Sequence, residues 1–375
     1  MFRNKSSSRW HLASWVVATL TCMAMAHAAE PIVVGRTLPL SGPLASYGHE
    51  KMAGADLVIS SENAKGGIGG RPIKVITLDD RYDPEITAQN ARTLKEQQAL
   101  LLLNSLGVGP VARLLPTVEE LKLPTIGLSS GSPEVRKPLR RYVFPVRADY
   151  NDEASFTVRQ LEVLAITSVI LLEQEDNFGK AVADAYRAAL QQSTKVRLLT
   201  TLKVKRDGPV SNAVAQALRA APQSILIATV AAPAADFLIA YRAGGGGAFA
   251  YAMSVTNASQ LAQMTEASRG TGFSQIVPLP TSRTKQVVRE YGDLCVKHGL
   301  EPTYYGLEGF IEAKVAVESL KRATKPISSE GLVDALASLS SLDLGDFEVT
   351  YGTTSRVGSR YVEMITIGSG GRLMK

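Results

Sequence analysis

The sequence predicts an α/β protein of two lobes, each built on a doubly wound parallel sheet that carries helices on both faces. Three observations lead to this prediction. Apolar, strand-like runs alternate with stretches of helical spacing, and the alternation occurs in two successive series. About 346 residues would remain after removal of an N-terminal leader, which is too long a chain for one ordinary core.

The strands of the two lobes are predicted from short apolar runs. The first series lies at 32–38, 73–78, 100–103 and 125–128, and the second at 169–172, 225–230 and 251–255. Residues 347–367 are also rich in strand-forming types. We place the change of lobe near Arg147 to Asp152. Because no low-complexity linker occurs there, we expect a continuous crossover that works as a hinge.

Helices are predicted where apolar residues recur with helical spacing between the strands. They lie at 50–63, 84–97, 111–121, 152–164, 180–190, 234–241, 284–296 and 309–322. In open sheets of this kind, ligands bind beyond the carboxyl ends of the strands, where helix N-termini offer free N–H groups. The loops that directly follow the strands are therefore the places to look for a site.

The first residues have the three parts of a secretory signal peptide. Arg3, Lys5 and Arg9 precede an apolar stretch over residues 12–26, and Ala26-His27-Ala28 supplies a small-x-small triplet. We expect residues 1–28 to be removed on export to the periplasm. The apolar stretch is shorter than the roughly 20 residues of a membrane-spanning helix, so a retained anchor is the alternative reading. A lipid-modified Cys22 is disfavoured because the residues before it do not fit.

Composition excludes several classes of function. Removing the leader lowers the formal charge from +6 to about +3, so the basic balance is poor evidence for nucleic-acid binding. Cys295 is then the one cysteine left, and no internal disulfide can form. His49 and His298 stand alone, without the clustered spacing of a metal site. We expect a monomer with no cofactor and no membrane insertion.

Two motifs resemble catalytic or phosphate-binding loops. Gly127-Leu128-Ser129-Ser130-Gly131 fits the nucleophile elbow of a serine hydrolase, but Pro133 follows where a helix should begin. The downstream His298 also lies near a helix end. The glycine-rich run at 66–70 precedes a strand, whereas a dinucleotide loop must follow one. We interpret both as turns, and a hydrolase is kept as a remote alternative.

A set of loop blocks occurs in order along nearly the whole chain. The blocks lie at 39–48, 63–71, 79–84, 107–110, 147–153, 176–179 and 305–310. Together they resemble the branched-chain amino-acid-binding (leucine/isoleucine/valine-binding) family, the type I periplasmic solute-binding proteins of ABC transporters. The resemblance implies a Venus-flytrap fold with three crossovers that closes on its ligand. By the same analogy, residues 31–147 with 279–345 form one lobe, and 148–278 with 346–375 form the other.

The resemblance also implies the partners and the binding site. The partners would be a small-molecule ligand, an ABC permease and its ATPase subunits; a ligand sensor coupled to a receptor is the alternative. Glu308, close to the expected hinge, is assigned a structural role. The expected ligand-binding residues are Tyr47, Gly107, Val108, Gly109, Ser129, Ser130, Gly131, Tyr150, Phe178, Ala231 and Thr256.

Some of these positions depart from the pattern of amino-acid binders. Many relatives have a hydroxyl where Val108 stands, and a bulkier residue where Ala231 stands. The loop at Thr256 lacks the acid that such proteins use for the ligand ammonium, although Glu175 and Asp176 are nearby acids. These departures favour a larger ligand, or a carboxylate without an amino group.

Overall fold

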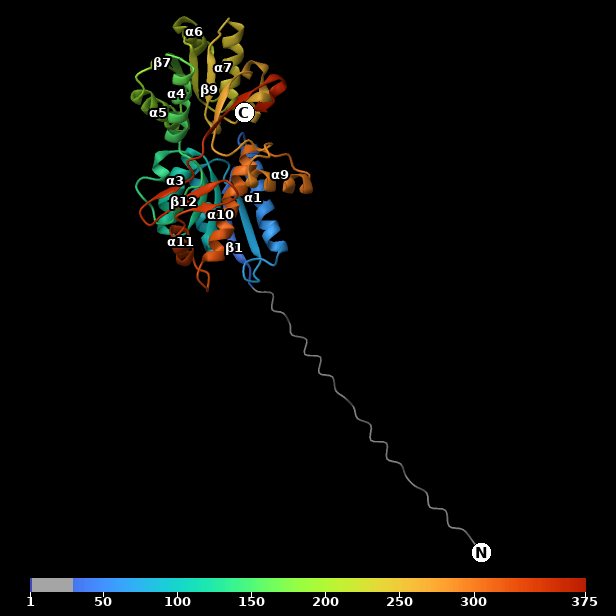
Figure 1. The fold of residues 1–375 in the computed structure, drawn as a ribbon. Helices are drawn as coiled ribbons and strands as arrows, with labels where there is room; N and C mark the ends of the chain where they lie inside the picture. Colours follow the sequence, from blue (N-terminus) through green and yellow to red (C-terminus); the bar gives the residue numbers. More distant parts are fainter. Residues whose placement is uncertain (2–29) are drawn as a thin grey trace.

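The computed structural model describes Met1 and residues 30–375. The predicted signal peptide therefore lies outside the described residues, apart from Met1. Two lobes are stacked one above the other, and the chain ends in the upper lobe (Figure 1). None of the helices in the described part is both long and apolar enough to cross a membrane.

The first lobe is built on a five-stranded parallel sheet with the order β2-β1-β3-β4-β5. Its strands are β1 (Ile32–Leu38), β2 (Ile73–Asp79), β3 (Leu101–Leu106), β4 (Thr125–Ser129) and β5 (Val143–Phe144). Its helices are α1 (Ala45–Ala64), α2 (Pro84–Glu96), α3 (Val108–Glu120), α9 (Gln286–His298), α10 (Tyr304–Arg322) and α11 (Ser329–Ala337), with a short 3₁₀ turn at Pro133–Val135. Leu101 and Leu103 face the core shared with α1 and α10, whereas Leu102 faces α2 and α3. The alternation of a strand thus gives each face its own helical layer.

The second lobe contains a seven-stranded sheet with the order β15-β14-β10-β9-β8-β6-β7. Its strands are β6 (Ser168–Gln174), β7 (Arg197–Val204), β8 (Ser224–Ala228), β9 (Phe249–Ala252), β10 (Gly272–Gln275), β14 (Glu363–Ile367) and β15 (Leu373–Met374). Its helices are α4 (Tyr150–Val163), α5 (Asn177–Gln192), α6 (Ser211–Ala220), α7 (Ala231–Ala243) and α8 (Ala258–Met264), with 3₁₀ turns at Ser254–Thr256, Glu266–Ser268 and Ser369–Gly371. At one edge β14 pairs antiparallel with both β10 and β15, and the remaining pairs are parallel.

A third, small antiparallel sheet joins β11 (Leu342–Asp343), β12 (Glu348–Tyr351) and β13 (Arg356–Gly358). It packs on the first lobe: the Tyr351 hydroxyl donates to the Pro145 carbonyl at 2.8 Å, and the Tyr351 ring meets Phe144 edge-on at 5.4 Å. The expected lobe boundary at residue 345 passes through this sheet, because β11 precedes it and β12 and β13 follow it. The chain returns to the second lobe at β14.

The helices α1 and α10 touch along their backbones. A Cβ on Gly54 would lie 1.8 Å from the Gly306 carbonyl oxygen, and one on Gly309 would lie 2.1 Å from the Lys51 carbonyl oxygen. Only glycine permits so close an approach. Two helices from opposite ends of the chain are thereby fixed together under the first sheet.

The predicted strands and helices are present, with two kinds of difference. The run at 251–255 is a strand only to Ala252 and continues as a 3₁₀ turn. Five strands and three helices were not predicted: β5, β7, β10, β11, β15, α6, α8 and α11. β7 lies at a sheet edge and is half-exposed, so it lacks the continuous apolar run that marked the central strands.

Candidate functional site

The carboxyl ends of the strands in both lobes face one another where the chain crosses between the lobes (Figure 1). Segments that follow β1 and β2 in the first lobe contact segments that follow β7 and β9 in the second lobe. The Tyr47 hydroxyl donates to the side-chain amide oxygen (Oε1) of Gln260 in α8 at 2.7 Å, and the Arg206 guanidinium lies 5.6 Å from the centre of the Tyr82 ring. We call Tyr47, Tyr82, Tyr305, Arg206 and Gln260 the cleft layer.

Tyr47, one of the expected ligand-binding residues, lies in this layer. It lies in the first turn of α1, is almost fully buried, and packs against Tyr305 with ring centres 4.8 Å apart. Burial raises the pKa of its hydroxyl, with the nearby charge of Glu50 adding to the effect. The hydroxyl therefore stays protonated and serves as a hydrogen-bond donor across the cleft.

Tyr82 reaches the cleft from a tight turn after β2. Its backbone is left-handed, with φ 63°, and its N–H donates to a carboxylate oxygen of Asp80 at 2.9 Å. The ring covers Gly107, where a Cβ would lie 2.2 Å from it. Burial raises the pKa of the Asp80 carboxyl to about 6. The turn that positions Tyr82 thus depends on a carboxylate held away from water.

The small residues after β3 and β4 are brought together, but their polar groups already have partners. The Gly107 N–H donates to the Ser129 carbonyl at 3.2 Å. The Ser129 hydroxyl donates to Glu308 at 2.9 Å and accepts from Lys51 at 2.5 Å. The Ser130 hydroxyl accepts from the Ser132 N–H at 3.3 Å. This corner stabilises the loops internally.

Val108, Tyr150 and Phe178 meet in one buried cluster that draws on both lobes. Tyr150 lies against Gly131, at which a Cβ would come within 2.3 Å of the ring, and the Tyr150 N–H donates to the Gly131 carbonyl at 2.8 Å. The first helix of the second lobe is therefore anchored on a loop of the first.

The remaining expected residues line the second lobe at helix starts and turns. Ala231 is the first residue of α7 and is buried. The Thr256 hydroxyl donates to the Thr229 carbonyl at 2.8 Å. Asp176 caps α5 and pairs with Arg206 at 3.3 Å, whereas Glu175 is exposed. Asp176 is thus already engaged with Arg206.

A groove of ≈ 550 Å³ lies beside this cluster, between α3 and α5. Val108, Gly109 and Ala112 line it from the first lobe, and Asn177 and Ala181 from the second. It is within the usual size of small-molecule sites. Two of the expected residues, Val108 and Gly109, therefore border open space between the lobes.

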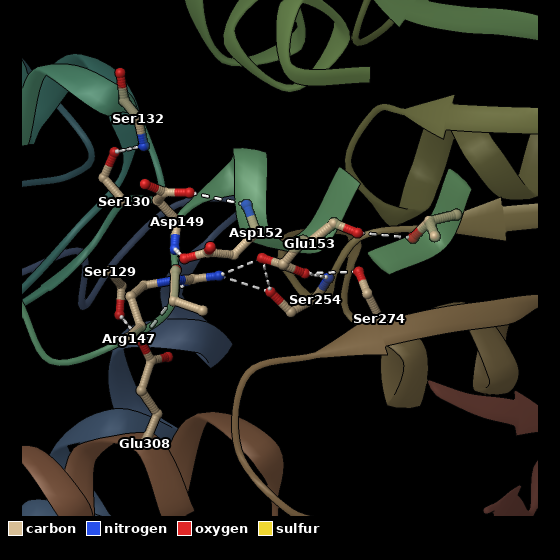
Figure 2. Close-up of polar contacts among 12 residues, drawn as sticks. Ser129, Ser130, Ser132, Arg147, Asp149, Asp152, Glu153, Ser254, Ser274 and Glu308 are labelled. Carbon is tan, nitrogen blue, oxygen red and sulfur yellow. Dashed lines mark hydrogen bonds and ion pairs between the residues drawn. The ribbon is translucent and has the colours of Figure 1, made fainter. Parts of the chain in front are cut away.

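A chain of buried charges connects the lobes behind the cleft; we call Lys51, Arg147, Glu153, Glu308 and Glu312 the hinge network. Figure 2 shows Arg147 between Glu308 of α10 and Glu153 of α4. Its guanidinium lies 3.0 Å from Glu153 and 3.6 Å from Glu308, while Lys51 Nζ lies 2.7 Å from Glu312. Ser254 and Ser274 of the second lobe also donate to Glu153, at 2.9 and 2.8 Å.

The carboxyl groups of the network differ in the direction in which their pKa values are shifted. Although burial opposes it, Lys51 and Arg147 lower the pKa of Glu308 below its ordinary value. Burial, together with the neighbouring charge of Glu308, raises the pKa of Glu312 to about 7. Glu308 contacts Ser129 at the end of β4, Lys51 of α1 and Arg147 of the first crossover, so it connects these segments to α10.

Several residues of the site were missed from the sequence. Tyr82 and Tyr305 lay inside loop blocks that had been recognised, and their aromatic type was the available signal. Arg206 follows β7 and Gln260 lies in α8. Neither element was predicted, so no signal in the sequence pointed to these two residues. Lys51 and Glu312 lie inside helices, where charged residues are typical of solvent-facing positions.

Among the described residues, no group of three or more histidine, cysteine, aspartate or glutamate side chains is arranged to hold a metal ion.

The chain matches the family model "Periplasmic binding protein" over residues 31–372. The chain belongs to the periplasmic binding protein family. Members of this family bind their ligands without transforming them, so this periplasmic binding protein is not an enzyme.

Similar proteins come from several bacteria. A "Leu/Ile/Val-binding protein homolog 7" of Brucella abortus is 22% identical over 91% of this chain and 89% of its own length. An "Amino acid binding protein" of Pseudomonas aeruginosa is 26% identical over 44% of this chain and 45% of its own. The match to the Escherichia coli Leu/Ile/Val-binding protein, 36% identical, spans 20% of this chain and 19% of that protein. The chain thus spans less than half of these last two relatives.

Solved structures match nearly the whole chain. A substrate-binding periplasmic protein from Ralstonia solanacearum is 30% identical, with a TM-score of 0.84, and the match covers 92% of this chain and 99% of that one. A branched-chain amino acid ABC transporter structure from Thermus thermophilus with bound valine is 18% identical, with a TM-score of 0.79, over 92% and 94% of the two chains. The second likeness shows the fold alone.

Proposed function

We propose that this periplasmic binding protein captures a small organic solute between its lobes and delivers it to an ABC permease with its ATPase subunits. The observation that carries the proposal is the contact between the two lobes at the carboxyl ends of their strands, Tyr47 with Gln260 and Tyr82 with Arg206. Ligands of open α/β sheets bind at such ends. Export through removal of residues 1–28 is part of the proposal.

The two parts of the chain that move relative to each other can be assigned from the sheet to which each segment belongs. We propose residues 31–147 with 279–359 as one lobe and 148–278 with 360–375 as the other. Opening would rotate them about the hinge network and separate the cleft layer. A ligand that contacts both lobes favours the closed form by its differential affinity for that form.

We propose that the ligand is a carboxylate or amide that needs no ammonium group. Asp176 is paired with Arg206, and Asp80 accepts from the Thr37 hydroxyl and the Tyr82 N–H. The loop of the second lobe that approaches Tyr47 presents Asn257, an amide. An ammonium ion would find no uncommitted carboxylate among these groups.

A thermal-shift screen tests this proposal. Amino acids, aliphatic and aromatic carboxylates, amides and urea are added to the purified protein, because a bound ligand raises stability with its concentration. We expect a carboxylate or amide to raise the Tm and amino acids to leave it unchanged. Response to leucine, isoleucine or valine alone would contradict the ligand class, and no response to any compound would contradict the site.

The variant Asn257→Asp sharpens the screen. Asn257 caps α8, its side chain accepting from the Gln260 N–H at 3.1 Å, and aspartate caps helices equally well. Its new charge near Tyr47 should weaken binding of a carboxylate at least tenfold in calorimetry and leave unfolding unchanged. Phe249→Ala, at an exposed aromatic of the same lobe, is the control. Equal affinity of Asn257→Asp and wild type would remove this loop from the site.

A further inference from the structure

A second cavity, of ≈ 360 Å³, lies near the crossovers between the lobes. Three segments line it: residues 133–139 after β4, the start of α4, and residues 354–360 around β13. The first and third belong to the first lobe and its last crossover, and α4 belongs to the second lobe. An occupant would thus touch both lobes outside the cleft layer.

The lining is predominantly basic. Arg136, Lys137, Arg356 and Arg360 supply positive charge, and Asp149 and Asp152 supply negative charge. Both carboxylates are already used: they cap α4 reciprocally, and Asp152 also pairs with Arg360 at 2.9 Å. Arg136 and Arg356 form no ion pair with any carboxylate in the described part of the chain.

Each of these two arginines, the buried Arg356 and the partly buried Arg136, has one guanidinium nitrogen without an acceptor among the described residues. Arg356 is 7% exposed, and its Nε has no hydrogen-bond acceptor among the described residues. Arg136 reaches the carbonyls of Arg147 and Val357, but its Nη1 has no such acceptor either. Burial lowers the pKa of both guanidinium groups. Asp149 and Asp152 oppose this lowering for Arg136 without forming a direct ion pair with it. A guanidinium withdrawn from water without a directly paired carboxylate is costly, and the cost is offset when an anion binds.

We propose that this cavity binds a small, doubly charged oxyanion of the phosphate class. Guanidinium groups pair with phosphate oxygens through paired, charge-assisted hydrogen bonds. Thr354 and Ser355 line the same cavity and add hydroxyl donors. The exposed Lys137 contributes a further charge at the rim. Because the anion would contact both lobes, its binding stabilises their relative position, independently of the solute in the cleft.

Titration calorimetry of the full chain with inorganic phosphate tests the proposal, at pH 8 and at an ionic strength held constant with sodium chloride. We expect saturable binding of one phosphate per chain. Arg136→Gln and Arg356→Gln should each weaken the Kd at least tenfold. Lys137→Gln should weaken it several-fold, and this exposed change keeps the fold intact even where a buried arginine variant does not. Arg283→Gln, at an exposed pair with Asp293, should match wild type.

Absence of saturable phosphate binding by wild type would overturn the proposal. So would an unchanged Kd in both Lys137→Gln and Arg136→Gln, or an equal loss in Arg283→Gln, which would indicate non-specific charge. Phosphate binding abolished by Tyr47→Ala but kept in the arginine variants would assign the anion to the cleft. That outcome also overturns this site, while leaving capture of a solute between the lobes in place.

Discussion

The hinge network and the cleft layer both connect the two lobes, yet they do so in opposite ways. The network is buried, and Arg147 and Lys51 each pair with two carboxylates. The cleft layer crosses between the lobes by one hydrogen bond, Tyr47 to Gln260, and one cation–π contact, Arg206 over Tyr82. Arg206 keeps 28% of its side chain exposed.

The difference indicates which contacts survive opening. Separating the network would leave charges unpaired in an apolar interior, at a cost of several kcal/mol per ion. Breaking the cleft layer exposes groups that water satisfies readily. The lobes are therefore expected to rotate about the network while the cleft layer parts, so one region fixes the motion and the other responds to the ligand.

The largest effect should come from Arg147→Met. Removing this cation leaves Glu153 and Glu308 without their shared partner, and breaking a buried pair costs about 3–5 kcal/mol. Urea unfolding should show a loss of that size. Arg283→Met, which removes an exposed pair, should cost no more than about 1 kcal/mol. Equal losses in the two variants would break the comparison, because the network would then be no stronger than a surface contact.

A pH-dependent effect should follow from Asp80→Asn in the turn that carries Tyr82. The folded pKa of about 6 lies above the unfolded value of about 3.9. The stabilisation linked to Asp80 is thus fully present below pH 4 and is lost as pH rises through 6. Relative to wild type, the variant should gain on the order of 2 kcal/mol in unfolding free energy between pH 4 and pH 7.5.

Urea titrations at the two pH values measure this gain. Asparagine keeps a side-chain oxygen for the Tyr82 N–H, so the turn itself should persist. If the stability difference between variant and wild type did not change with pH, burial would not disfavour the ionised form of Asp80. The turn that carries Tyr82 would then not be destabilised at neutral pH.

The smallest effect should come from Tyr47→Phe. The ring stays on Tyr305, and the hydrogen bond to Gln260 is lost. One such bond contributes about 0.5–1.5 kcal/mol, so affinity for the ligand identified by the screen should fall roughly 3–10-fold in calorimetry. Gln260→Met should have a similar effect, and the double variant should be no worse than either. Additive losses of affinity in the double variant would show that Tyr47 and Gln260 act on the ligand independently, not through their shared hydrogen bond.

Most central strands could be predicted because their residues are buried on both faces and form continuous apolar runs, as in β4 and β8. β10 was missed because its four residues, Gly272–Gln275, do not form such a run. The sequence placed Tyr47, Val108 and Phe178 in segments that follow strand ends, and in the structure Val108 and Phe178 share one buried cluster. The pairing of Arg206 with Tyr82 could not be predicted, because it joins separate lobes and depends on how they close. The burial of Lys51 and Glu312 could not be predicted either, because it depends on the close packing of α1 against α10.

That helix pair has a consequence for how the protein forms during synthesis. Gly54 of α1 is in contact with Gly306 of α10, so the first lobe cannot complete its core until nearly the whole chain has been made. Contacts so distant in sequence close slowly, because a long loop must be ordered first. The part of the first lobe that is synthesised first therefore cannot complete its packing until α10 has been synthesised.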